Sequence, residues 1–270
     1  AIVRQWTSLA DDSSPLRVAM FHGALANAPD GDEACAAAMV DLKERSTDRI
    51  RFGNVKLLLD GSIQGGTARL RWPGYHHGGP NGIWLIAPDQ YAERLAPYHR
   101  AGLQVHTHAN GDEAVDVLLD GLEQVQLAHP RPDHRHTVQH CQLTTPGQYR
   151  RMRALGMCAN VFANHTWFWG DQHRDITVGP DRAARMNAAR TALDLGVPLS
   201  IHSDSPVSPL GSLHVAWAAV NRLTPSGQVL GADERITVAE ALHAITMGAA
   251  WQLRMEDEIG SITPQKFADC

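Results

Sequence analysis

Val197-Pro-Leu-Ser-Ile-His-Ser-Asp204 is a short apolar strand that ends in an aspartate. Two earlier stretches end in a histidine in the same way, Leu103-Gln-Val-His-Thr-His108 and Arg135-His-Thr-Val-Gln-His140. His108 and His140 lie 32 positions apart, and Asp204 follows His140 by 64 positions, twice that interval. An interval of about thirty residues is the length of one strand–helix unit. Residue types that bind metals therefore recur at the same end of successive strands.

Strands and helices alternate along the rest of the chain. We expect strands at 17–21, 54–59, 103–107, 136–140, 157–162 and 197–202. We expect helices at 32–44, 88–100, 112–127, 145–155, 181–195 and 237–251, and a long glycine-rich loop at 61–82. Strict alternation predicts parallel strands joined by crossover helices. The predicted fold class is α/β.

Six strands allow two architectures. A (β/α)8 barrel of the TIM type has eight strands, so this chain would be incomplete by two. The abrupt start at Ala1 favours a piece of a longer protein with those strands upstream, and a complete chain without its initiator methionine is the alternative. An open doubly wound sheet would need no further strands. However, no Gly-x-Gly-x-x-Gly turn follows the first strand, so a dinucleotide-binding fold has little support.

The composition excludes several classes of partner. The 270 residues are 43% hydrophobic with a net charge of −5, and no run rich in lysine or arginine occurs. This balance argues against nucleic acid or a membrane surface as a partner. We expect a small-molecule substrate, and a cytoplasmic location is favoured. A barrel without two strands would expose apolar edges, which favours homo-oligomers.

Residues two apart on a strand share a face, so the polar set that includes His108, His140 and Asp204 faces inward. In a parallel barrel the carboxyl ends of the strands form the active site. Neutral imidazole and carboxylate groups suit zinc and similar ions, which lower the pKa of bound water. A single histidine on a strand is more often a hydrogen-bonded core residue. Three such residues at equivalent strand ends favour a divalent metal site, with zinc as the expected ion and one or two ions bound.

Lys56 lies in a strand that otherwise consists of valine and leucine, where a charged amine is costly. Two interpretations stay open. The lysine pairs with a buried carboxylate such as Asp60, or it is held neutral and reacts with carbon dioxide to become a bridging metal ligand.

Several motifs, in order, resemble the amidohydrolase superfamily. They are Val55-Lys-Leu-Leu-Leu-Asp-Gly-Ser62 with Gly66-Thr67-Ala68, Val105-His-Thr-His-Ala-Asn-Gly-Asp112, His140-Cys-Gln-Leu143 and Ser203-Asp-Ser-Pro-Val207. The nearest branch looks like amidohydrolase family 3, which includes N-substituted formamide deformylases. This resemblance implies a metal-dependent hydrolase barrel over residues 1–258. It also implies that 259–270 begin the return to a small β-sandwich domain.

The resemblance also implies roles for single residues. Lys56 would be a carboxylated, bridging ligand, and His108 and His140 would bind the second metal. Asp204 would bind the first metal and act as general base and acid while a metal-activated hydroxide hydrolyses a C–N bond of amide or formamide type. A mononuclear deaminase and a non-catalytic binding or regulatory protein are the alternatives.

The chain departs from the family's pattern in its first metal site. The family carries a His-x-His pair on its first strand, and His22 is the only histidine before Lys56. We therefore expect residues 1–270 alone to bind metal weakly and to lack normal turnover.

Three further residues are predicted to bind substrate. His165 and Trp167 lie in an aromatic segment at 164–173 that we read as a substrate-contacting loop, with aromatic packing as the alternative. His202 precedes Asp204 by two positions and would orient it, with a deeper core position as the alternative.

Overall fold

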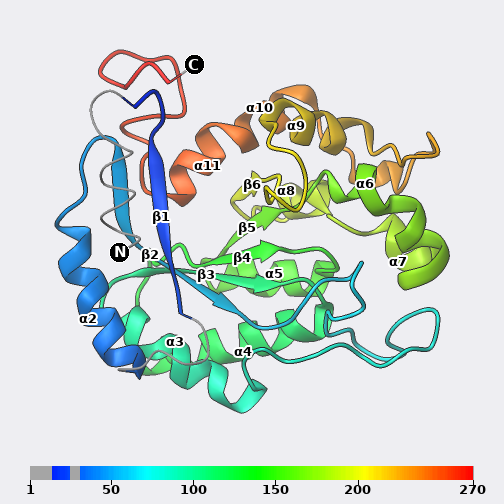
Figure 1. Cartoon of the computed structure of the whole chain (residues 1–270), viewed down its shortest axis with the longest axis horizontal. Helices are drawn as coiled ribbons and strands as arrows, with labels where there is room; N and C mark the ends of the chain where they lie inside the picture. The colour runs from blue at the N-terminus through cyan, green and yellow to red at the C-terminus, as the bar shows by residue number, and fades with distance from the viewer. Residues whose placement is uncertain (1–13, 25–30, 270) are drawn as a thin grey trace.

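The computed structural model describes residues 14–24 and 31–269 and places six parallel strands in one sheet (Figure 1). The strands follow one another in chain order, and all six are those expected from the sequence. Their bounds are β1 Val18–Gly23, β2 Ile50–Leu58, β3 Gln104–Ala109, β4 Thr137–His140, β5 Cys158–Val161 and β6 Leu199–Ile201.

This strand order distinguishes the two architectures. A doubly wound sheet reverses direction at a switch point, as in the order 3-2-1-4-5-6. The order here, β1 to β6, has no reversal within the described residues. The sheet is therefore of the (β/α)8-barrel type, and the chain supplies six of its strands.

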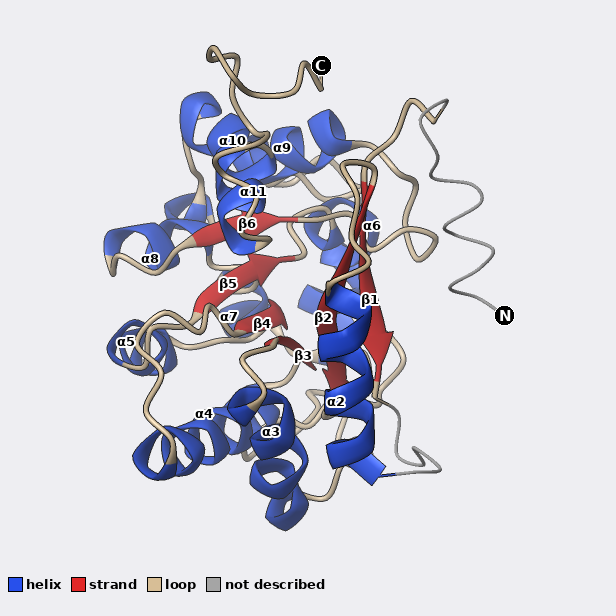
Figure 2. Cartoon of the chain, turned by 90° about the vertical axis from the view of Figure 1, so that its left-hand side faces the viewer, coloured by secondary structure: helices blue, strands red, loops and turns tan. Residues whose placement is uncertain are grey.

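Helices cover the sheet. Figure 2 shows α3, α4, α5 and α8 in a layer along one side of the strands. The α-helices are α2 Gly31–Lys43, α3 Tyr91–Arg100, α4 Asp112–Ala128, α5 Pro146–Ala154, α6 His165–Gln172, α7 Pro180–Ala184, α8 Ala189–Asp194, α9 Ser212–Asn221, α10 Val238–Ile245 and α11 Met247–Gln252. Shorter helical turns are η1 Pro88–Gln90, η2 His173–Thr177 and η3 Ala232–Glu234. No described helix is both long and apolar enough to cross a lipid bilayer.

The alternation of side chains along the strands builds the core. Val55 and Leu57 of β2 are fully buried in the apolar cluster, and Val105 of β3 and Val138 of β4 belong to the same cluster. Lys56 lies between two of these residues and so points to the opposite face. The apolar face packs on the helices, and the polar face is turned toward the barrel interior, where it positions the candidate site.

The helix expected at 181–195 is interrupted in the structure. Arg222 is buried and donates hydrogen bonds to the carbonyl oxygens of Met186, at 2.8 Å, and Asn187, at 3.1 Å. Asn187 has a positive φ of 51°. Because the guanidinium takes these carbonyls and Asn187 turns the backbone, the segment forms two short helices, α7 and α8.

Three other expectations have a definite outcome in the structure. The long loop at 61–82 is confirmed, since it contains no helix or strand. The predicted loop at 164–173 is wrong, because His165–Gln172 is helix α6. The helix expected at 237–251 is split at Thr246, whose φ of −120° and ψ of −94° separate α10 from α11. Residues 259–269 contain no strand, and the division into domains at 258 stays a prediction.

Candidate metal centre

Three ligand-type side chains converge at the carboxyl ends of the strands. His140 is the last residue of β4, and His202 and Asp204 follow β6. One donor atom from each of the three lies within 4.8 Å of the others. We call His140, His202 and Asp204 the ligand group. The sequence expected His140 and Asp204 as metal ligands, but it placed His202 among the substrate-binding residues.

Two residues of this edge have strained backbones. His140 and Asp204 have positive φ angles of 79° and 54°, in the left-handed region. A residue other than glycine pays on the order of 1–3 kcal/mol to stay there, and such strain gathers at functional sites. His140 ends β4, and Asp204 lies three residues after the end of β6.

His108 lies beside the ligand group without being part of it. Its ring meets that of His140 edge-on, with centroids 4.5 Å apart. Its Nε2 is 3.0 Å from the carbonyl oxygen of Gly61 and 3.0 Å from Nδ2 of Asn110. Because these contacts occupy Nε2, Nδ1 is the nitrogen that His108 has free for a metal. Its predicted role as a ligand stays a prediction.

Asp204, rather than Asp60, is the carboxylate whose negative charge interacts with the Lys56 amine. Burial lowers the pKa of Lys56 to about 8, and the charge of Asp204 opposes this effect. The Asp60 carboxylate is occupied elsewhere, since it accepts hydrogen bonds from the backbone N–H groups of Arg69, Asn110 and Gly111. The interpretation in which Lys56 pairs with Asp60 therefore finds no support.

The residues of the ligand group fit a divalent metal ion. Nδ1 of His140 and Nε2 of His202 are buried and have no hydrogen-bond partner. Burial lowers the pKa of His202 to about 3 and that of His140 well below its usual value. Both rings are therefore neutral, which is the form that binds metals. No other set of three such side chains within the described ranges is close enough to share an ion.

Helix α6 places the predicted substrate-binding residues on two different sides. The His165 ring lies 3.5 Å from that of Phe162, which lies 4.9 Å from His202 of the ligand group. The Trp167 ring instead packs against Trp217 of α9 at 5.2 Å. The structure thus brings His165 to the site but not Trp167, whose surroundings match the aromatic-packing alternative.

The sequence did not identify Trp169 as a neighbour of His165. It lies one helical turn after His165, and the two ring centroids are 4.4 Å apart. Residues four apart share a face of a helix, so this spacing would have identified Trp169 if 164–173 had been read as helical.

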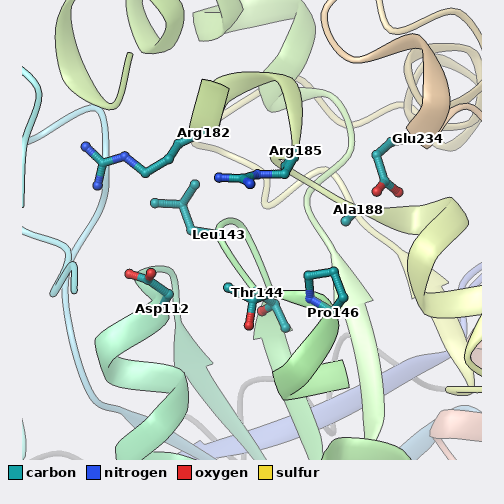
Figure 3. Close-up of a pocket in the computed structure, with 9 residues that line it drawn as sticks. Asp112, Leu143, Thr144, Pro146, Arg182, Arg185, Ala188 and Glu234 are labelled. Carbon is teal, nitrogen blue, oxygen red and sulfur yellow. The ribbon is translucent and has the colours of Figure 1, made fainter. Parts of the chain in front are cut away.

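A separate cavity of about 170 Å³ lies between the start of α5 and the segment that joins α7 and α8 (Figure 3). Figure 3 shows the Arg185 guanidinium reaching across it above Leu143, with Asp112 and Thr144 on the opposite side. Its lining includes no member of the ligand group. This cavity is therefore distinct from the candidate metal centre.

Comparisons with known proteins identify similar sequences and a similar fold. The sequence profile of the amidohydrolase family matches residues 7–270. Protein LONG AFTER FAR-RED 3 from Arabidopsis thaliana is 30% identical over 238 residues, which are 86% of this chain and 40% of that protein. N-substituted formamide deformylase from Arthrobacter pascens is 30% identical over 173 residues, which are 63% of this chain and 31% of that protein.

A solved structure has a similar fold over most of this chain. An uncharacterized metal-dependent hydrolase from Pyrococcus furiosus superposes with a TM-score of 0.71 at 27% identity, covering 86% of this chain and 47% of its own. The chain spans less than half the length of each of these three proteins.

Proposed function

We propose, given that this chain belongs to the amidohydrolase family, that it carries part of the active site of a metal-dependent hydrolase of C–N bonds, acting on an amide or a formamide. The observation that carries the proposal is the ligand group, whose three donor atoms lie within 4.8 Å of one another at the strand ends. A formamide deformylase and a metal-dependent hydrolase are among the similar proteins, which supports the reaction class.

His140, His202 and Asp204 would hold a divalent ion, with His108 through Nδ1 and Lys56 as further ligands. Zinc is the ion we expect from these nitrogen and oxygen donors. Such an ion, when bound, would lower the pKa of a bound water molecule to about 7 and so supply a nucleophile at neutral pH.

Asp204 would move the proton. Burial raises the pKa of its carboxyl group, and nearby Lys56 lowers it again. One carboxylate oxygen takes a proton from the attacking water and delivers it to the nitrogen of the leaving amine as the C–N bond breaks. The products are a carboxylic acid and an amine, and the proton given up by water ends on the amine.

Lys56 would supply a carboxylate ligand after reaction with carbon dioxide. A pKa of about 8 leaves part of the amine neutral near pH 7–8. The neutral nitrogen attacks carbon dioxide, an N–C bond forms, and one proton is released. The resulting carbamate has two oxygens that can bind metal, which the amine does not.

A second candidate is a one-ion site of the mononuclear deaminase type. The three residues of the ligand group are close enough to hold a single ion without Lys56 or His108. Lys56 would then remain an ordinary amine. Mass spectrometry under non-acidic conditions separates the two candidates, because only the first predicts a one-CO2 increment on Lys56.

A zinc titration by calorimetry tests the proposal with the chain as it is. We expect weak binding of zinc to residues 1–270 and no normal turnover, since no His-x-His pair precedes Lys56 in this sequence. His140→Ala and Asp204→Ala should abolish binding, whereas His243→Ala, which changes an exposed histidine of α10, should not. Equal zinc binding by all four proteins would overturn the proposed site.

A further inference from the structure

A chain of buried hydrogen bonds leads from helix α6 to the residues after β4. The side-chain amide nitrogen of Gln142 lies 2.6 Å from Nδ1 of His165 and 3.3 Å from Nε2 of His173. Nδ1 of His173 in turn lies 2.8 Å from the hydroxyl oxygen of Thr177. All four residues are at most 3% exposed, so these contacts are shielded from water.

The Gln142 amide decides which nitrogen of each ring carries the proton. An amide NH2 group has two hydrogens and can donate one to each histidine. Nδ1 of His165 and Nε2 of His173 are then acceptors, so the protons lie on Nε2 of His165 and Nδ1 of His173. The latter proton is donated to Thr177.

The reverse orientation of this amide is less favourable. In that orientation the NH2 group would take the place of Oε1 of Gln142, which is buried and has no hydrogen-bond partner. Both amide hydrogens would then be buried without an acceptor. An orphaned buried N–H group is rarer in proteins than an under-satisfied carbonyl oxygen. The orientation with both hydrogens on the histidines is therefore the stable one.

One donor of this network is left over. Nε2 of His165 is buried and has no hydrogen-bond partner. The ring lies against Phe162, which also contacts His202 of the ligand group. Buried polar groups in folded proteins have partners, so a donor left over beside a candidate metal centre indicates an acceptor on a bound molecule.

We infer that Gln142 is a positioning residue that fixes the proton of His165 on Nε2, and that this N–H donates a hydrogen bond to the carbonyl oxygen of the substrate amide. The second part rests on the proposed function. A carbonyl oxygen gains negative charge when water attacks its carbon, and a preplaced donor stabilises that charge. Removal of such a donor typically lowers kcat by about 100- to 1000-fold.

The position of the proton can be measured without turnover or metal. Nitrogen NMR of the full chain with 15N-labelled histidine should show His165 protonated on Nε2 and bare on Nδ1. Gln142→Glu replaces the donor by a carboxylate that only accepts, so a proton should appear on Nδ1 of His165. The matched control is Thr177→Val, which removes the partner of His173 and should leave His165 unchanged.

The spectrum of the unsubstituted chain is decisive even if a variant fails to fold. A proton on Nδ1 instead of Nε2 of His165 in that spectrum would overturn the inference. An unchanged His165 in a folded Gln142→Glu protein would overturn it as well.

The contact with substrate is tested with N-ethylformamide as the probe. Its addition should move the proton resonance of His165 Nε2–H downfield and leave that of His173 in place. No shift at saturating probe would contradict the donor role. The zinc affinity of His165→Ala should equal that of the unsubstituted chain, so loss of metal binding and loss of this hydrogen bond are separate results.

Discussion

Two clusters of buried histidines lie at opposite ends of the strands, and they differ in how their ring nitrogens are used. At the amino ends, His99, His134 and His136 form what we call the histidine triad. Nδ1 of His99 is 2.9 Å from Nε2 of His136. The other four nitrogens contact the carbonyl oxygens of His129 and Leu155 and the backbone N–H groups of Val105 and His136. Every ring nitrogen of the triad has a partner.

The carboxyl ends show the opposite pattern. His140, His165 and His202 each have a buried ring nitrogen with no partner. His106, one layer deeper on β3, has none on either nitrogen. In barrels of this type the amino-terminal face serves stability and the carboxyl-terminal face serves chemistry. At the strand ends, unpartnered nitrogens therefore mark the histidines that we expect to bind a ligand, and satisfied ones mark those that hold the fold; His106 lies deeper and is assigned no ligand.

The largest expected effect comes from removing the central ring of the triad. His136→Leu leaves the Val105 N–H and Nδ1 of His99 buried without partners, at about 1–3 kcal/mol each. We expect the free energy of unfolding to fall by about 4 kcal/mol in urea titrations. The matched change His202→Leu breaks no such hydrogen bond and should cost less than about 1 kcal/mol. Equal losses would remove the distinction between the clusters.

The second largest effect is a loss of folding stability in acid, caused by protonation of the histidine triad. Burial lowers the pKa of His134 to about 4, below the value of about 6.5 in an unfolded chain. The unfolded state therefore binds the proton first, so stability is full above pH 6.5 and falls as the pH drops toward 4. His134 alone contributes a loss of about 3 kcal/mol over that range. In urea titrations at several pH values, the free energy of unfolding should fall less steeply with acid in His134→Gln than in the unsubstituted chain. An equally steep fall in both proteins would contradict the role given to His134.

Zinc should stabilise the folded protein by binding at the carboxyl ends of the strands only. At a concentration of 100 times its dissociation constant, a ligand that binds only the folded state stabilises it by about 2.7 kcal/mol. We expect this gain in the unsubstituted chain and in His134→Gln, and none in His202→Leu, in thermal melts with and without zinc. A gain retained by His202→Leu would exclude His202 from the ligand group.

No loss of stability is expected at Lys56. Desolvation lowers the pKa of this buried amine to about 8, so its charged form destabilises the folded state at neutral pH. Lys56→Met should therefore leave the free energy of unfolding unchanged or raise it, while any one-CO2 increment at this position disappears. A loss of several kcal/mol would show that Lys56 is a structural residue.

Local patterns in the sequence were enough to predict the strands and the edge where the site lies. All six strands were predicted because short apolar or alternating stretches lie between helical patterns, and Gly102, Gly156 and Gly196 mark where helices give way to β3, β5 and β6. His140 and Asp204 could be placed together because parallel strands end at the same edge of the sheet.

The errors arose where contacts between distant residues decide the structure. Arg222 interrupts the helix expected at 181–195 from about 35 positions away, and no local pattern reports this. The dense aromatic residues of 164–173 hid a helix whose two faces separate His165 from Trp167. The role of His202 depends on how close β4 and β6 bring two side chains, which spacing along the chain does not give. Gln142 was part of a quoted motif, but its partners lie 23 and 31 positions away.

The ligand group is tested most directly by anomalous diffraction at the zinc edge from crystals of the zinc-soaked chain. The account predicts one peak bounded by His140, His202 and Asp204 at the carboxyl ends of the strands, and none at the histidine triad. A peak at the triad, or only at His76 and His77 of the glycine-rich loop, would contradict it.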